Sequence, residues 1–312
     1  AERQPLGIPV MSEEEIRQTC VENGGYETAE LNDKLYLHMR GYAKIESLDK
    51  YTGCKAIWLE SNAISKIEGL DALKEVRCLY LAKNMISTIE NLGSLSDLIT
   101  LDLSNNRIRL IEGLSCLRNL DTLNISKNYL ETAESIEHLT ECSALRTLDL
   151  TNNKLPAQEN IIEVLKAIPG LVTLSLNGNE ITKLPQYRKK MIFSIPAMGY
   201  LDRPVDEIET LAATAFHEGG AEAEKAAREA YRDAQAQKRK DEMEQFKTWQ
   251  AEEREKRKNM PAAKKFEIAT ADEERRRLRE IEARKDAALE AKALDLGVSK
   301  LALHMMNGDG SI

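Results

Sequence analysis

Three aromatic side chains recur at intervals of 22 residues near the start of the chain: Tyr36, Trp58 and Tyr80. Each stands between two aliphatic residues, as in Leu35-Tyr36-Leu37, so alternation along a strand would turn the aromatic ring away from the core. Tyrosine and tryptophan side chains gathered on one surface are typical of sites that bind another protein. The polar residues that share this pattern, or follow it by two positions, are His38, Glu60, Asp102, Asn124 and Asp149.

Residues that could carry out catalysis or hold a metal show no comparable pattern. The four histidines are isolated, the five cysteines form no Cys-x-x-Cys pair, and the sequence has no phosphate-binding loop, nucleophile elbow or His-Glu-x-x-His motif. We therefore expect no catalytic residues, no metal site and no cofactor. The chemistry that the sequence offers is recognition of another protein.

Charge and hydropathy exclude two further classes of partner. The chain of 312 residues carries 44 basic and 52 acidic side chains, a net charge of −8, which argues against a dedicated nucleic-acid-binding protein. The apolar stretch Met191–Leu201 has 11 residues and contains Pro196, whereas a membrane-spanning helix needs about 20. The first fifteen residues have no apolar core of a secretory signal. We expect a cytoplasmic chain with free thiols.

The aromatic spacing belongs to a longer repeat of the form Leu-x-Leu-x-x-Asn. The repeated asparagines are Asn62, Asn84, Asn106, Asn128, Asn153 and Asn179, with spacings of 22, 22, 22, 25 and 26 residues. An earlier unit opens at Leu35, with Arg40 in the asparagine position. One unit cannot bury its own leucines, but stacked units share a continuous core. The sequence predicts an α/β leucine-rich-repeat solenoid of about seven repeats with a parallel concave sheet.

The register of the repeats predicts the position of individual side chains. Cys54 and Cys142 fall in leucine positions of the core, Cys78 falls on the sheet face, and Cys116 falls on the outer turn. The aromatic and polar residues of the first paragraph line the concave face, where we expect a protein partner. Two alternatives remain open: the aromatic rings only stabilise the sheet, or the C-terminal helix of the same chain lies in the groove.

Composition divides the chain into five segments. Ser12-x-x-Glu15 is a capping-box pattern for a short helix that would close the N-terminal end of the solenoid. Apolar residues between Pro185 and Pro204 suit a second cap. The expected segments are a tail and capping helix at 1–30, the solenoid at 31–184, its C-terminal cap at 185–205, a charged helical extension at 206–296 and a flexible tail at 297–312.

The extension is rich in Ala, Glu, Lys, Arg and Gln, which are strong helix formers. We expect one helix over 221–260, bounded by Gly219-Gly220 and Pro261, and a second over about 272–294. No heptad pattern is sustained, so a long coiled coil is not predicted and a monomer is expected. A second candidate docking surface on this helix consists of Met243, Phe246 and Trp249.

At this point the residues carry a resemblance. The recurring Ile-Glu-x-Leu step, for example Ile67-Glu68-Gly69-Leu70, is similar to the 22-residue subclass of leucine-rich repeats. Residues 31–70, with their Leu-Tyr-Leu-His and Tyr-Thr-Gly stretches, resemble the axonemal dynein assembly factors of leucine-rich-repeat type. So do residues 141–155 and 185–205, followed at once by a charged helix.

The resemblance implies a non-enzymatic factor that helps to assemble dynein arms in the cytoplasm before transport into cilia or flagella. The partners that it implies are dynein heavy or intermediate chains and chaperone machinery, with the cilium or flagellum as a further location. Two alternatives remain: a structural axonemal or dynein-associated leucine-rich-repeat subunit, and a phosphatase-regulatory leucine-rich-repeat protein.

Overall fold

The computed structural model describes residues 9–259, 261, 270, 273–281, 283–284 and 287. It divides into two compact units, residues 1–232 and 233–312, and each is described by itself. The expected flexible tail at 297–312 and residues 1–8 of the expected N-terminal segment lie outside the described residues.

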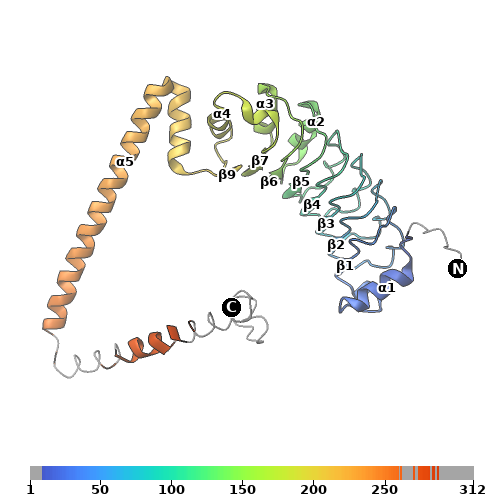
Figure 1. The fold of residues 1–312 in the computed structure, drawn as a ribbon, viewed down its shortest axis with the longest axis horizontal. Coiled ribbons are helices and arrows are strands. Elements are labelled where there is room, and N and C mark those ends of the chain that lie inside the picture. The colour runs from blue at the N-terminus through green and yellow to red at the C-terminus, as the bar shows by residue number, and fades with distance from the viewer. Residues whose placement is uncertain are drawn as a thin grey trace. The chain divides into compact units, whose positions relative to one another are not determined.

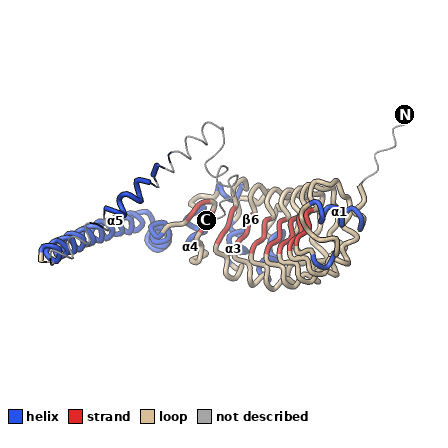
Figure 2. The backbone as a smooth tube through the Cα atoms, turned by 90° about the horizontal axis from the view of Figure 1, so that it is seen from below, coloured by secondary structure: helices blue, strands red, loops and turns tan. Residues whose placement is uncertain are grey.

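The first unit is a succession of short strands, each followed by a turn that leads to the next strand. Eight strands pair in parallel in chain order, and a ninth pairs antiparallel with the eighth. They form one continuous row (Figure 2). The strands are β1 (Lys34–Tyr36), β2 (Ala56–Trp58), β3 (Cys78–Tyr80), β4 (Thr100–Asp102), β5 (Thr122–Asn124), β6 (Thr147–Asp149), β7 (Thr173–Ser175), β8 (Tyr200–Leu201) and β9 (Arg203–Pro204).

The strands lie along the inner side of the curved stack in Figure 1, and α2 and α3 lie on its outer side. The central residue of each of the first seven strands is buried and its two neighbours are not, as the alternating Leu-x-Leu pattern requires. The leucine-rich-repeat solenoid predicted from the sequence is thereby confirmed. The helical elements between the strands are α2 (Glu134–Glu137), η2 (His138–Glu141), α3 (Glu159–Lys166) and η3 (Glu180–Lys183).

The repeated asparagines join neighbouring repeats through the backbone. Nδ2 of Asn84 donates to the carbonyl oxygens of Leu59 and Leu81, both at 3.0 Å, and its Oδ1 accepts from the backbone amide of Ile64 at 3.1 Å. At each bend the asparagine side chain therefore forms hydrogen bonds with backbone groups that have no partner in the sheet. The same arrangement recurs at Asn62, Asn106, Asn128, Asn153 and Asn179.

Both ends of the stack are closed by additional elements. At the N-terminal end, α1 (Glu13–Glu22) begins at Ser12, whose side chain accepts a hydrogen bond from the amide of Glu15 at 3.3 Å, as the capping-box pattern predicts. A short turn, η1 (Ala29–Leu31), leads from it to β1. Met11 and Ile16 are buried in the core, so α1 covers the first repeat.

At the C-terminal end, α4 (Tyr187–Ser194) covers the last repeat. The apolar residues that the sequence assigns to this cap are buried: Tyr187, Met191, Ile192, Ile195, Met198 and Leu201. The cap differs from the prediction in one respect, because it also contributes β8 and β9 to the sheet. The stack therefore has eight parallel strands rather than seven, and β8 pairs with the edge that β7 would otherwise expose.

The helix α5 (Glu207–Lys258) begins earlier than the sequence predicts. Asp206 accepts the amide of Glu209 on its side chain at 2.8 Å and so starts the helix. Gly220, with φ 72° and ψ −157°, interrupts the helical backbone, so a second segment begins after the Gly219-Gly220 pair, as the sequence predicts. What the sequence did not predict is the helical segment that precedes the glycine pair, where Ala212 and Ala213 are buried against the rest of the first unit.

Residues 207–232 contact the C-terminal cap. The Phe193 ring stacks on His217 with the centroids 3.7 Å apart, and Lys189 forms an ion pair with Glu224. In the second unit, α5 continues to Lys258, three residues short of Pro261. Residues 273–281, from the expected second helical run over 272–294, are also helical, and residues 288–294 of that run lie outside the described residues.

Candidate functional site

The rings of Tyr36, Trp58 and Tyr80 form a continuous stack across three neighbouring strands. Strand pairing sets Tyr36 opposite Trp58 and Trp58 opposite Tyr80. The ring centroids of the first pair are 4.7 Å apart and those of the second 5.3 Å, with interplanar angles of 20° and 17°. The alignment that the 22-residue spacing predicts is therefore present in the fold, and we name these three residues the aromatic row.

The aromatic row is half-buried rather than fully exposed, because each ring covers a face of its neighbour. Aromatic pairs of this kind are worth about 0.5–1.5 kcal/mol beyond the area that they bury. The row therefore contributes to the stability of the sheet, as one alternative supposed. Its outward ring edges remain on the concave side, and stability and recognition are compatible roles for the same side chains.

Two aspartates that continue the face accept hydrogen bonds from backbone amides just after their own strands. Oδ1 of Asp102 accepts from the amide of Ser104 at 2.8 Å, and its Oδ2 accepts from Nδ2 of Asn124 at 3.2 Å. Asp149 accepts from the amide of Thr151 at 2.8 Å in the same way. These side chains thus stabilise turns at the ends of their strands, and part of their hydrogen-bonding capacity is already used.

Glu60 differs from the other carboxylates of the face. Its Oε2 atom is buried and has no hydrogen-bond partner among the residues that the structure describes. Burial raises the pKa of this carboxyl above its usual range, while the charge of neighbouring His38 acts in the opposite direction. His38 is itself exposed, in the turn that follows β1. At Glu60 the effect of burial thus outweighs the hydrogen bond from its own backbone amide and the neighbouring positive charges.

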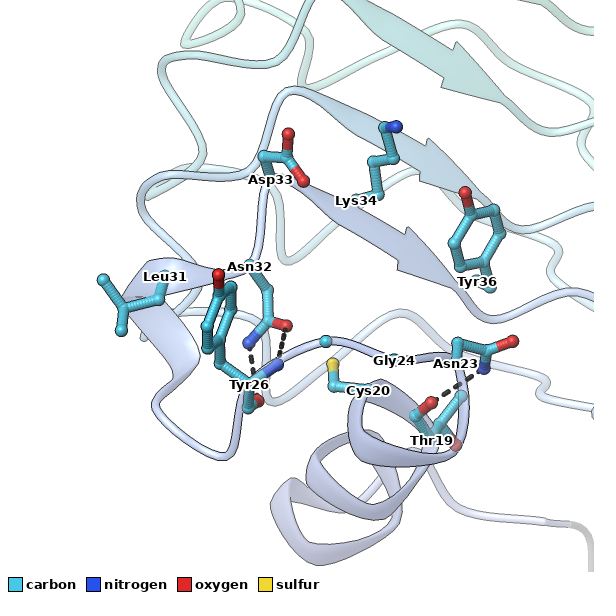
Figure 3. Close-up of a pocket in the computed structure, with 11 residues that line it drawn as sticks. Thr19, Cys20, Asn23, Gly24, Tyr26, Leu31, Asn32, Asp33, Lys34 and Tyr36 are labelled. Carbon is cyan, nitrogen blue, oxygen red and sulfur yellow. Dashed lines mark hydrogen bonds between the residues drawn. The ribbon is translucent and has the colours of Figure 1, made fainter. Parts of the chain in front are cut away.

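A cavity at the N-terminal cap adjoins the aromatic row, and sequence reasoning missed it. Its volume is about 250 Å³, and Tyr36 forms part of its wall (Figure 3). Lys34 enters from the same strand, and Tyr26 and Leu31 come from the loop after α1. The amide of Tyr26 donates to Asn32 Oδ1 at 2.9 Å and so fixes that loop.

The second predicted docking surface lies on the part of α5 that belongs to the second unit. Met243, Phe246 and Trp249 are 56%, 51% and 54% exposed, and the rings of Phe246 and Trp249 stack with centroids 5.7 Å apart. This stripe is apolar surface on a helix that is otherwise charged. Its role in docking stays a prediction.

The cysteines lie where the repeat register places them. Cys54 and Cys142 are buried, Cys78 is half-buried on the sheet face and Cys116 is exposed. Burial raises the pKa of the Cys142 thiol to about 11 and that of Cys54 to about 12, so both thiols stay protonated at neutral pH. Among the residues that the structure describes, no group of three or more His, Cys, Asp or Glu side chains could hold a metal ion. Within the same residues, no helix is long and apolar enough to cross a membrane.

Comparison with known proteins gives consistent matches. A sequence model described as leucine-rich repeat matches residues 83–230. The leucine-rich repeat-containing protein ODA7 of Chlamydomonas reinhardtii is 56% identical over 220 residues, which are 70% of this chain and 51% of that protein. Dynein axonemal assembly factor 1 of Mus musculus is 57% identical over 222 residues, 70% of this chain and 35% of that protein.

A third relative extends the comparison to insects. The dynein axonemal assembly factor 1 homolog of Drosophila melanogaster is 48% identical over 227 residues, which are 72% of this chain and 15% of that protein. The chain thus spans about half the length of the algal relative and a smaller part of the other two.

Proposed function

Because this chain is a leucine-rich-repeat protein homologous to the dynein axonemal assembly factor 1 proteins, we propose that it is a non-enzymatic assembly factor for axonemal dynein arms. It binds protein partners in the cytoplasm and helps to assemble dynein arms for cilia or flagella. The partners proposed are dynein heavy or intermediate chains and chaperone machinery. The observation that carries the proposal is 56–57% identity to the algal and murine relatives over 220 and 222 residues, 70% of this chain.

The concave face is the proposed contact surface. Its aromatic row supplies rigid rings that lose little conformational freedom on binding, and such residues dominate the binding energy of many interfaces. The polar side chains of the face set its charge preference: His38 and Glu60 follow the strands of the row, and Asp102, Asn124 and Asp149 continue the face on the next strands. The row and the cavity beside Tyr36 together offer a partner a flat apolar surface and one recess.

The competing location within this chain is the Met243, Phe246 and Trp249 stripe. The chain has two tryptophans, one on each surface, which makes a matched pair of variants possible. Tagged chain, Trp58→Ala and Trp249→Ala are used to capture dynein heavy chain from the cytosol and, separately, from the axonemes of a ciliated cell. Trp58→Ala should weaken capture by at least about 2 kcal/mol, roughly 30-fold in affinity, if it is a binding hot spot.

Recovery of dynein heavy chain mainly from cytosol supports assembly, and recovery from axonemes alone contradicts it in favour of a structural axonemal subunit. Loss of capture in Trp249→Ala with normal capture in Trp58→Ala would move the contact from the concave face to the helix. Thermal unfolding of both variants checks that each remains folded.

A further inference from the structure

The turn that follows each strand forms a second, separate surface at the edge of the sheet. The backbone there stays in register: the amide of Lys83 donates to Ser104 O and that of Lys127 to Thr151 O, both at 2.8 Å. Two residues farther on, the amides of Arg107 and Tyr129 donate to the preceding repeat at 2.8 and 2.9 Å. Equivalent side chains of successive repeats therefore form rows, and neighbours within a row are about 4.8 Å apart at the backbone.

In the third to sixth repeats these rows are basic. We name the following exposed residues the basic edge: Lys83, Arg107, Arg109, Lys127, Tyr129 and Lys154. Glu131 lies among them and pairs with Lys154 at 2.8 Å. Five positive charges against one negative charge stand out in a chain whose net charge is −8.

Two of these cations act on a carboxylate of the chain at longer range: Lys83 favours the ionised form of Glu60, and Arg109 that of Glu131. Within the described residues, no ion pair involves Lys83, Arg107, Arg109 or Lys127. The first repeats differ, because Lys44 and Lys66 each approach Glu68, at 3.9 and 4.0 Å. Positive charge at the basic edge is therefore available to a group from outside the chain.

The Tyr129 ring organises the centre of the basic edge. Lys154 Nζ lies 5.0 Å from the ring centroid and the Arg109 guanidinium carbon lies 5.8 Å from it, both within the range of cation–π attraction. Tyr129 is 40% exposed, and Met85, in the same row, is 44% exposed. The edge thus combines oriented cations with apolar surface for a neighbouring side chain.

We propose that the basic edge is a second binding surface, which takes an acidic protein segment carrying an apolar side chain. Glutamate or aspartate side chains of the segment pair with Arg107, Arg109 and Lys127, and its apolar residue contacts the ring of Tyr129. Planar guanidinium groups can bind carboxylates through two hydrogen bonds, which favours this kind of ligand.

The surroundings favour an acidic peptide over a nucleic acid. The polar half of the adjacent concave face carries Asp102 and Asp149, which repel any polyanion that extends beyond the basic edge, and therefore act more on a long polyphosphate chain than on a short segment. The basic edge covers four repeats only, so its positive field is local. A short segment with a few carboxylates matches this extent better than a charged polymer that continues in both directions.

The test is fluorescence anisotropy with the full chain and a labelled oligoglutamate peptide that contains one tryptophan. A peptide with glutamine in place of every glutamate measures the contribution of the charges. Arg107→Glu combined with Lys127→Glu reverses two charges of the basic edge. Lys74→Glu combined with Arg118→Glu makes the same change of net charge on exposed turns outside it.

We expect the oligoglutamate peptide to bind at low ionic strength, with affinity that falls as salt is added. The Arg107/Lys127 variant should lose about tenfold or more, and the Lys74/Arg118 variant less than about twofold. Trp58→Ala should bind the peptide normally, because the basic edge is separate from the aromatic row. Partner capture through the concave face and peptide binding here can therefore fail independently.

Three results would overturn the proposal. They are absence of peptide binding by the full chain at low salt, equal losses in the two double variants, and tighter binding of a single-stranded RNA oligonucleotide that depends on Arg107 and Lys127. The second would mean that net charge alone attracts the peptide, and the third would assign the surface to nucleic acid.

Discussion

Arg188 donates two hydrogen bonds to the carboxylate of Glu209, from Nε at 3.1 Å and from Nη2 at 2.6 Å. Both side chains are largely shielded from solvent, with 21% and 16% of their surfaces exposed. Arg188 also donates to the carbonyl oxygens of Leu201 and Pro204. One guanidinium thus ties together α4, the β8–β9 turn and the start of α5, so the first segment of α5 is part of the solenoid cap.

We predict that Glu209→Gln destabilises the first unit by about 1–3 kcal/mol, because it removes a charge-assisted pair and leaves Arg188 undercompensated. Urea unfolding followed by circular dichroism measures the change. Glu222→Gln, at an exposed position on the same helix, is the control and should change the unfolding free energy by less than about 0.5 kcal/mol. Equal effects of the two substitutions would contradict this account of the cap.

The effect of Glu209 should depend on pH in a defined direction. Its hydrogen bonds to Arg188 lower the pKa of the carboxyl below its usual range. A depressed carboxyl pKa contributes stability that is complete above the unfolded value of about 4.3 and is lost as the pH falls through the folded value. The difference in unfolding free energy between the wild-type chain and Glu209→Gln should therefore be largest near neutral pH and shrink under acid conditions. A constant difference from pH 7 to pH 3 would refute the linkage.

Glu60 should behave in the opposite way. Burial raises the pKa of its carboxyl, and its Oε2 has no partner among the described residues, so the ionised form is disfavoured in the folded chain. We expect Glu60→Gln to stabilise the chain by up to about 1 kcal/mol at pH 7. The gain should disappear as the pH falls through about 4.3, where the carboxyl is protonated even in the unfolded chain. Destabilisation at neutral pH would indicate that Glu60 has a compensating partner.

For the repeated asparagines, we predict a larger loss of stability on substitution. Asn84→Ala removes the acceptor of the Ile64 amide and one donor each from the carbonyl groups of Leu59 and Leu81. We expect a cost of about 2–3 kcal/mol, because the Ile64 amide is left buried without a partner.

Thermal or urea unfolding of the same chain measures this loss. Asn119→Ala is the comparison, since Asn119 is exposed and donates a single hydrogen bond to Ser96 O at 3.1 Å. Similar losses for the two variants would show that the buried amide is not the source of the cost.

The repeat period was sufficient to predict the solenoid, the parallel register and the outward position of the aromatic row. These follow from local rules, because each unit alternates buried and outward residues and each unit stacks on the next. The same register placed Cys54 and Cys142 in the core. It could not show that Asp102 and Asp149 spend hydrogen-bonding capacity on their own strand ends, since that depends on side-chain geometry.

Elements without a repeat were harder to predict. The glycine pair at 219–220 is a strong helix-breaking signal, but whether a helix precedes it depends on tertiary contacts such as Arg188 with Glu209 and Phe193 with His217. The eighth strand was missed for a similar reason, because Tyr200–Leu201 becomes a strand only by pairing with β7. Short strands have little local signal of their own.

The sequence alone determined the class of this protein: a stack of leucine-rich repeats with a charged helix after it, aromatic rings one repeat apart, and a resemblance to dynein assembly factors. The tertiary structure decided which side chains are already engaged and which are free for a partner. It showed that Asp102 is hydrogen-bonded whereas one Glu60 oxygen is buried without a partner among the described residues. It also joined the start of α5 to the cap and placed Arg109 and Lys154 beside the ring of Tyr129. Periodicity fixes the direction of a side chain, whereas its availability depends on neighbours from other repeats, which only the folded chain brings together.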